Sequence, residues 1–269
     1  MTRLVRSLAR LPGVRRLWQR FPVGSVALRA RFDIWPRPAY GYGVFRAAEL
    51  AVALGLPGLS VIEFGVAGGR GLLALESIAA TVAAHFGVRI AVVGFDSGQG
   101  LPKPVDYRDL PYLWNEGFYT MDVEALRRRL QHAALILGDV AATVPGYLAS
   151  RPDPIGFVAF DLDYYSSTRD ALAVFRGPEE TRLPRVFCYF DDLILPERAC
   201  YNDYTGEYLA LHEFNAEEPT KKLGKLPHLR LVREHPAAWQ EQIYVLHDFA
   251  HGLYVTPINA PQHGTQKPL

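Results

Sequence analysis

The sequence Leu59-Ser60-Val61-Ile62-Glu63-Phe64-Gly65-Val66-Ala67-Gly68-Gly69-Arg70-Gly71 joins a short apolar run to a glycine-rich turn. A segment with helical character follows it over residues 72–86. Glycine tolerates positive φ, and its missing side chain lets a ligand lie against the backbone. The first amides of the following helix are hydrogen-bond donors with partial positive charge. This strand–turn–helix order is the context in which a glycine-rich motif indicates a nucleotide-like ligand.

Strands and helices alternate along most of the chain. We expect helices at 44–54, 72–86, 122–132, 140–149 and 167–175, with an irregular connector over 21–42. Apolar runs predict seven strands, at 61–64, 89–95, 134–137, 156–161, 185–190, 230–234 and 242–247. The pattern predicts an α/β fold: a doubly wound, mostly parallel, seven-stranded Rossmann-like sheet with an antiparallel C-terminal hairpin and an N-terminal helical extension.

Length and composition favour one large soluble domain. The chain has 269 residues, of which 49% are hydrophobic and 21% charged, and its net charge is +1, so nothing points to nucleic acid as a partner. The two cysteines fit neither a disulfide framework nor a zinc site, which favours a cytoplasmic protein. We expect a helical arm and connector at 1–58, a ligand-binding domain at 59–255 with an insert at 196–226, and a tail at 256–269.

The first twenty residues combine arginines with apolar residues at helical spacing. No uninterrupted apolar core follows, so this is not a secretory signal, and no run is long enough to span a bilayer. A basic amphipathic helix can lie on a membrane surface. We expect instead that it packs on its own domain or on a partner subunit, which suggests a homo-oligomer without stable membrane association.

Each predicted parallel strand ends in an acidic or glycine-bearing signature. In a doubly wound sheet, ligands bind beyond the carboxyl ends of the strands. Charges are costly to gather without partners, so a ligand, a cation or both should lie among them. The signatures are Glu63 with the glycine turn, Asp96-Ser97, Gly138-Asp139, Asp161-Leu162-Asp163 and Asp191-Asp192.

Two of these signatures suit a nucleoside. Asp96 is placed to accept hydrogen bonds from a ribose diol, although a helix N-cap or a loop carboxylate is an alternative. Gly138-Asp139 is placed to hold an adenine, with the carboxylate accepting from the exocyclic amine. Asp139 is also a good helix N-cap, and the two roles do not exclude each other.

The fourth and fifth strand ends supply three further carboxylates. Asp163, Asp191 and Asp192 offer hard oxygen ligands with no histidine or thiolate, a donor set that favours Mg²⁺ or Ca²⁺ over zinc. Asp161 lies two residues before Asp163, on the same strand face, and is a candidate general base. Alternatively, some of these groups only cap helices, since a capping-box pattern starts at Ser167.

Four motifs in order carry a family resemblance. They are Glu-Phe-Gly-Val-Ala-Gly-Gly at 63–69, Phe-Asp-Ser-Gly-Gln-Gly-Leu-Pro at 95–102, Asp-Leu-Asp-Tyr-Tyr-Ser-Ser-Thr at 161–168 and Asp-Asp at 191–192. Together they resemble the class I S-adenosylmethionine-dependent methyltransferases, and most closely the macrocin/mycinamicin sugar O-methyltransferases. The likeness covers about half of the chain, residues 59–193.

The resemblance implies roles for individual residues. The residues that would bind S-adenosylmethionine come from the glycine turn and from the next three strand ends. They are Glu63, Gly65, Val66, Ala67, Gly68, Gly69, Asp96, Ser97, Gly138, Asp139 and Asp161. Asp161 would also be the base, and Asp163, Asp191 and Asp192 would bind Mg²⁺. Residues 99–118 would form a lid that excludes water from an in-line methyl transfer. The acceptor would be a small molecule, a sugar or a glycosylated or aromatic natural product.

The chain departs from the family pattern at several positions. Leu162 stands where the family has glycine, and Ser166 where it has glutamate. The insert contributes several aromatic residues and His212, a second candidate base, although a lone histidine on a helix is more often structural. These departures leave open an N-methyltransferase without metal and a non-catalytic cofactor-binding or assembly protein. A nicotinamide-dependent dehydrogenase shares the glycine turn but does not explain the carboxylates at 163 and 191–192.

Overall fold

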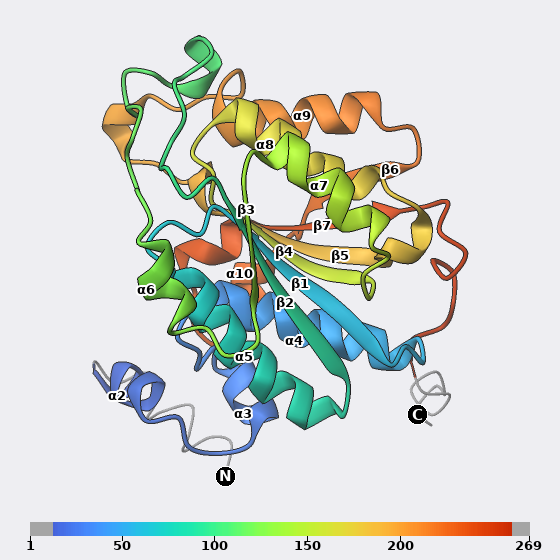
Figure 1. Cartoon of the computed structure of the whole chain (residues 1–269). Helices are drawn as coiled ribbons and strands as arrows, with labels where there is room; N and C mark the ends of the chain where they lie inside the picture. The colour runs from blue at the N-terminus through green and yellow to red at the C-terminus, as the bar shows by residue number, and fades with distance from the viewer. Residues whose placement is uncertain (1–12, 260–269) are drawn as a thin grey trace.

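The protein folds around one seven-stranded sheet, seen in a computed structural model that describes residues 13–259 (Figure 1). The strand order is β3-β2-β1-β4-β5-β7-β6. Strands β1 to β5 run parallel, whereas β7 pairs antiparallel with both β5 and β6. The strands are β1 Gly58–Phe64, β2 Arg89–Asp96, β3 Ala134–Leu137, β4 Ile155–Phe160, β5 Arg182–Phe190, β6 Lys221–Lys225 and β7 Ile243–Asp248. The predicted mixed Rossmann-like sheet is confirmed.

Helices cover both faces of the sheet. Figure 1 shows α4 and α5 on one face and α7, α8 and α9 on the other. Each face has its own apolar core, one built from α4, α5 and the sheet and the other from the sheet, α8 and α9. The α-helices are α2 Val14–Arg20, α3 Val26–Arg31, α4 Pro38–Ala53, α5 Arg70–Phe86, α6 Val123–Arg127, α7 Val140–Ala149, α8 Tyr165–Ala171, α9 Gly206–Glu217 and α10 Leu229–Val232.

The end of the sheet differs from its prediction. The predicted strand at 230–234 is wrong, because residues 230–232 belong to the short helix α10, which follows its N-cap residue His228 at φ 59°. The strand that pairs with β7 is instead β6, inside the segment predicted to be an insert. Its sequence, Lys-Lys-Leu-Gly-Lys, has one buried apolar side chain. Lysines on an edge strand discourage pairing with other chains, and they also hide the strand from a search for apolar runs.

The predicted connector over 21–42 is also partly wrong. It contains α3, and α4 begins at Pro38, where the proline occupies the first helical turn, a position that tolerates a missing N–H. Aromatic residues in this segment are not loop residues but core residues, with Trp35 and Tyr40 almost fully buried. The N-terminal segment therefore belongs to the same core as the sheet.

The basic N-terminal helix is described from residue 14 onward, as α2, and its predicted part before residue 13 lies outside the described residues. Within α2, the Trp18 ring packs on Phe32 at a centroid distance of 5.7 Å. Arg15 and Gln19 donate to the Asp33 carbonyl, each at 3.4 Å. These contacts place α2 on its own domain. No helix in the described part of the chain is long and apolar enough to cross a membrane.

Candidate functional site

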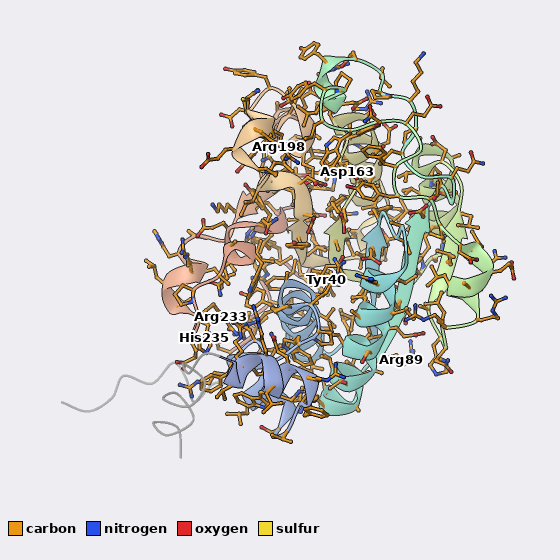
Figure 2. All side chains as sticks on the ribbon, turned by 90° about the vertical axis from the view of Figure 1, so that its left-hand side faces the viewer. Tyr40, Arg89, Asp163, Arg198, Arg233 and His235 are labelled. Atoms are coloured by element: carbon orange, nitrogen blue, oxygen red, sulfur yellow. The ribbon has the colours of Figure 1, made fainter. Side chains whose placement is uncertain are left out.

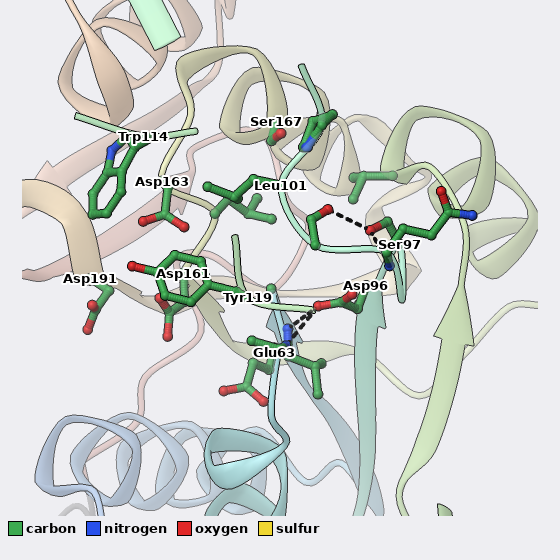
Figure 3. A pocket seen from close by; sticks show the side chains of 18 of the residues that line it. Glu63, Asp96, Ser97, Leu101, Trp114, Tyr119, Asp161, Asp163, Ser167 and Asp191 are labelled. Carbon is green, nitrogen blue, oxygen red and sulfur yellow. Dashed lines mark hydrogen bonds between the residues drawn. The ribbon is translucent and has the colours of Figure 1, made fainter. Parts of the chain in front are cut away.

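A cleft of about 940 Å³ opens at the carboxyl edge of the parallel strands (Figure 3). The structure brings almost all of the predicted site residues to it. Gly69 and His212 are the two exceptions. The predicted residues that line the cleft are Glu63, Gly65, Val66, Ala67, Gly68, Asp96, Ser97, Gly138, Asp139, Asp161, Asp163, Asp191 and Asp192.

The glycine turn is shaped by close backbone contacts. Gly65 has φ 82°, and a Cβ there would lie 1.8 Å from the Asp161 carbonyl oxygen. Gly69 has φ 80° and caps α5, with its own missing side chain facing Leu126 rather than the cleft. At Gly68, by contrast, a Cβ would meet no atom within 4 Å. The turn therefore leaves open space at Gly68, where a ligand can approach the backbone.

Asp96 ties this turn to the end of β2. Its Oδ2 accepts from the amides of Val66 and Ala67, both at 2.8 Å, and its Oδ1 accepts from the Gly98 amide at 2.6 Å. Each carboxylate oxygen offers two lone pairs, so Oδ1 keeps capacity for a ligand hydroxyl. The neighbouring Ser97 hydroxyl donates to the Gly100 carbonyl at 3.0 Å.

Asp139 caps helix α7. Its Oδ1 accepts from the Ala141 amide at 2.8 Å, so the N-cap role that the sequence allowed is present. Gly138 before it has φ 135°, a conformation that side chains rarely adopt. A second role for this pair, in binding an adenine, stays a prediction.

Four aspartates lie together in one half of the cleft. Figure 3 shows Asp161, Asp163 and Asp191 in this half and Asp96 in the other. The Asp161 Oδ2 lies 3.6 Å from Nη1 of Arg37, the cation that pairs with this group in the described residues. Burial, and then the charge of Asp191, raises the pKa of Asp161 to about 7. Burial with the Asp161 and Asp191 charges raises the pKa of Asp163 to about 7 as well.

The backbone of these aspartates is held from below by a buried glutamate. The Asp163 amide, at φ 61°, donates to Asp192 Oδ2 at 2.9 Å. The Asp192 amide donates in turn to Glu207 Oε2 at 3.0 Å. Burial, followed by the charge of Asp192, raises the pKa of Glu207 well above its usual value. Glu207 therefore fixes the turn that carries Asp191 and Asp192.

Glu207 was not predicted, although the sequence carries a signal for it. On α9 it shares one face with Ala210, Leu211 and Phe214, at the spacing i, i+3, i+4 and i+7. All four are buried. An acidic residue at an apolar position of a helix indicates a buried partner, here the Asp192 amide.

The donor chemistry of the predicted metal triad fits a hard cation, because Asp163, Asp191 and Asp192 are all carboxylates in one cleft. Their arrangement fits a metal ion less well than their chemistry does. Between residues 13 and 259, no three His, Cys, Asp or Glu side chains are gathered in a way that could hold a metal ion. Asp192 spends Oδ2 on the Asp163 amide, and Asp191 Oδ1 accepts a hydrogen bond from the Tyr189 hydroxyl.

The predicted lid segment lies over the cleft and is anchored by Asp109. This residue, in a short 3₁₀ turn over Tyr107–Asp109, is fully buried. Its carboxylate accepts from the Val105 amide at 2.8 Å and from the Ser166 amide and hydroxyl at 2.8 and 3.0 Å. Ser166, one of the departures from the family pattern, thus links the segment to α8.

One aromatic side chain of this segment, Trp114, and one directly after it, Tyr119, face the aspartates. Trp114 and Tyr119 line the cleft with their ring centroids 6.2 Å apart and their planes at 60° to each other. Burial and the charges of the four aspartates raise the pKa of Tyr119, which places it beside them (Figure 3). This half of the cleft therefore combines carboxylates with aromatic rings.

The second predicted base is not at the site. His212 lies exposed on α9, with its ring tilted against Tyr208 at 6.3 Å, and it does not line the cleft. Asp161 remains the candidate base.

Two solved structures with a similar fold are methyltransferases. The chain is similar to the calicheamicin methyltransferase CalS11, with 23% identity, a TM-score of 0.52 and coverage of 87% of this chain and 89% of that one. It is also similar to the O-methyltransferase NovP, with 16% identity, a TM-score of 0.52 and coverage of 82% and 87%. Comparisons by sequence find no matching family model and no matching curated protein. The protein therefore has the fold of class I methyltransferases.

Proposed function

We propose that the protein is an S-adenosylmethionine-dependent O-methyltransferase that methylates a hydroxyl group of a sugar or another natural-product small molecule. One observation carries this proposal. A glycine turn with open space at Gly68 and a group of four carboxylates share a single cleft, at the ligand-binding edge of a fold also found in CalS11 and NovP. The motifs at 63–69, 95–102 and 161–168 support the same assignment.

The cofactor fits the half of the cleft around β1 to β3. The backbone of residues 65–69 would lie along the cofactor, with Asp96 and Ser97 at the ribose and Gly138 and Asp139 at the adenine. Glu63, at the floor of this half, would take the methionine end, because an ammonium group needs an acidic partner. Placing the methyl group against the acceptor supplies a large part of catalysis in such a transfer.

The acceptor fits the half that contains Asp161, Asp163, Trp114 and Tyr119. Aromatic rings beside carboxylates suit a sugar, whose ring presents C–H groups on one face and hydroxyls around its rim. Asp161 lines the cleft at the end of β4 and would take the proton of the hydroxyl that is methylated. General base catalysis of this kind contributes on the order of 10²–10⁴-fold.

Mg²⁺ is part of this proposal as an assisting ion. Asp163, Asp191 and Asp192 would hold it, and when bound it would polarise an acceptor hydroxyl. The supporting feature is the donor set, which consists of oxygen atoms whose mutual repulsion a cation would relieve.

Calorimetric titration of S-adenosylhomocysteine, with Mg²⁺ and then with EDTA, tests the proposal. We expect binding in both conditions, and a separate Mg²⁺ isotherm that Asp191→Ala abolishes. Absence of S-adenosylhomocysteine binding at ~mM ligand together with binding of NAD would refute the methyltransferase assignment. Binding of S-adenosylhomocysteine with no Mg²⁺ isotherm would keep the cofactor assignment and remove the metal.

A further inference from the structure

Helix α4 reaches the floor of the cofactor half through Tyr40. This side chain is fully buried, and Figure 2 shows it inside the molecule beside the helix. Its ring contacts Phe157 and Tyr189 of the sheet at centroid distances of 5.7 and 5.8 Å. Its hydroxyl donates a hydrogen bond of 2.6 Å to Glu63 Oε1. A residue outside the glycine-turn motif is thus bonded directly to the acidic residue of that motif.

Glu63 is held in one orientation on the Oε1 side. Gly71 on α5 makes room for the carboxylate, because a Cβ at that position would lie 1.8 Å from Oε1. The other oxygen, Oε2, is buried and accepts no hydrogen bond within residues 13–259. Leaving a buried carboxylate oxygen without a partner is costly, so this oxygen has unused capacity for a donor. Glu63 also lines the cleft, where such a donor would arrive with a ligand.

The charges around Glu63 are few. Arg37 donates to the Tyr40 hydroxyl at 3.3 Å, and its guanidinium lies over the Tyr40 ring at 5.1 Å. Asp161 at the end of β4 and Asp96 at the end of β2 face Glu63 with like charge. Burial raises the pKa of Glu63 to about 8, whereas the hydrogen bond from Tyr40 and the charge of Arg37 act in the lowering direction. Tyr40 itself keeps its proton, since burial and Glu63 raise its pKa.

We propose that Tyr40 is a positioning residue that orients Glu63 to bind the ammonium group at the methionine end of the cofactor. The inference rests on the proposed function, and it extends the cofactor site to a helix that the motifs do not include. In this arrangement Tyr40 occupies Oε1 and leaves Oε2 for the ammonium group. Arg37, which also lines the cleft, stabilises the tyrosine by donating to its hydroxyl.

The test is calorimetric titration of S-adenosylhomocysteine into the full chain and into Tyr40→Phe, which keeps the ring and its packing. A hydrogen bond to a charged group is worth enough that we expect affinity at pH 7 to fall about tenfold. Tyr42→Phe is the matched control, a buried tyrosine on the same helix whose ring packs on Phe187 and Trp239 instead. We expect it to bind like the wild type.

A pH series separates positioning from a purely structural role. Without Tyr40 the pKa of Glu63 rises further, so fewer carboxylates are ionised at neutral pH. For a rise of about one unit, the tenfold loss at pH 7 shrinks to about threefold at pH 8.5. In the Glu63→Gln background, Tyr40→Phe should cause no further loss. A loss that is equal at all pH values, or that persists in Glu63→Gln, would contradict the inference.

The two hypotheses fail in different ways. Wild-type protein that binds no S-adenosylhomocysteine overturns the proposed function, and this inference with it. Wild-type binding that Tyr40→Phe leaves unchanged overturns the inference alone. Thermal melting of each unliganded variant shows whether a weaker signal comes from loss of folded protein, and a folded Tyr40→Phe with the pH-dependent loss supports the inference.

Discussion

Substitutions at two glycines of the turn, Gly65 and Gly68, should distinguish an effect on stability from an effect on ligand binding. Gly65→Ala places a side chain at φ 82°, which costs roughly 1–2 kcal/mol. Its Cβ would also lie 1.8 Å from the Asp161 carbonyl oxygen, a clash with backbone that must be relieved by movement, at about 1–3 kcal/mol. We therefore expect Gly65→Ala to lower the free energy of unfolding by about 2–5 kcal/mol.

Gly68→Ala should behave in the opposite way. Its Cβ meets no protein atom within 4 Å, so we expect the free energy of unfolding to change by no more than about 0.5 kcal/mol. The same methyl group enters the cleft where the cofactor would touch the backbone. Affinity for S-adenosylhomocysteine should then fall by at least about tenfold, the size of a lost contact of about 1.4 kcal/mol.

Urea unfolding and calorimetric titration of both variants test this pair. Gly68→Ala that binds S-adenosylhomocysteine as tightly as the wild type would show that no ligand approaches the backbone there, and the reasoning from open space would be refuted. Gly65→Ala with wild-type stability would refute the reading of the close contact with Asp161.

Three further predictions concern buried acids. Because the folded protein keeps a proton on Glu63 up to about pH 8 whereas the unfolded chain releases it near pH 4.5, the contribution of Glu63 to the stability of the unliganded protein should be full below pH 4.5 and be lost, by at most about 5 kcal/mol, as the pH rises to 8. Since burial also raises the pKa values of Asp161 and Asp163, Glu63→Gln should reduce the pH dependence in urea titrations without abolishing it. Glu207→Ala leaves the Asp192 amide without its acceptor and should lower the free energy of unfolding by about 1–3 kcal/mol. It should lower the rate of methyl transfer far more than the affinity for S-adenosylhomocysteine, and Glu207→Gln should restore both stability and activity. Equal activity in the two variants would exclude this role. Asp109→Asn has one carbonyl oxygen for three donors, so hydrogen exchange at the Ser166 amide should accelerate, and unchanged exchange would show that the lid anchor lies elsewhere.

Local sequence patterns were enough to predict the sheet and the residues at the carboxyl ends of its parallel strands. Parallel strands bury both faces and read as apolar runs, so their carboxyl ends, and with them Asp96, Asp161 and Asp191, could be located from the sequence. Edge strand β6 could not, because lysines fill three of its five positions and Leu223 is its one buried apolar residue. The aromatic-rich connector was misjudged for a related reason, since proline, glycine and tyrosine suit a loop and equally the first turns of buried helix α4.

The residues that support the site, Tyr40 and Glu207, were not predicted, because their contacts join segments that are distant in the sequence. Tyr40 and Glu63 are 23 residues apart, and Glu207 and Asp192 are 15 apart across an irregular segment. Neither pair has a spacing rule, because the partner is chosen by how a helix packs on the sheet. A polar residue at a buried position of a helical pattern does predict that the residue has a hydrogen-bond partner, although it does not predict which residue that partner is.

These two buried contacts lie beneath different halves of the cleft. Tyr40 on α4 supports Glu63 beneath the half proposed for the cofactor, and Glu207 on α9 supports Asp192 beneath the half proposed for the acceptor. The two helices cover opposite faces of the sheet, so each half of the cleft is stiffened by a different core. The two supports are nevertheless connected, because Arg37 donates to the Tyr40 hydroxyl and pairs with Asp161, and the Tyr40 ring packs on Tyr189, which donates to Asp191. Residues that share partners in this way do not act independently, so we expect substitutions at Tyr40 and Asp161 to show an interaction energy in a double-mutant cycle.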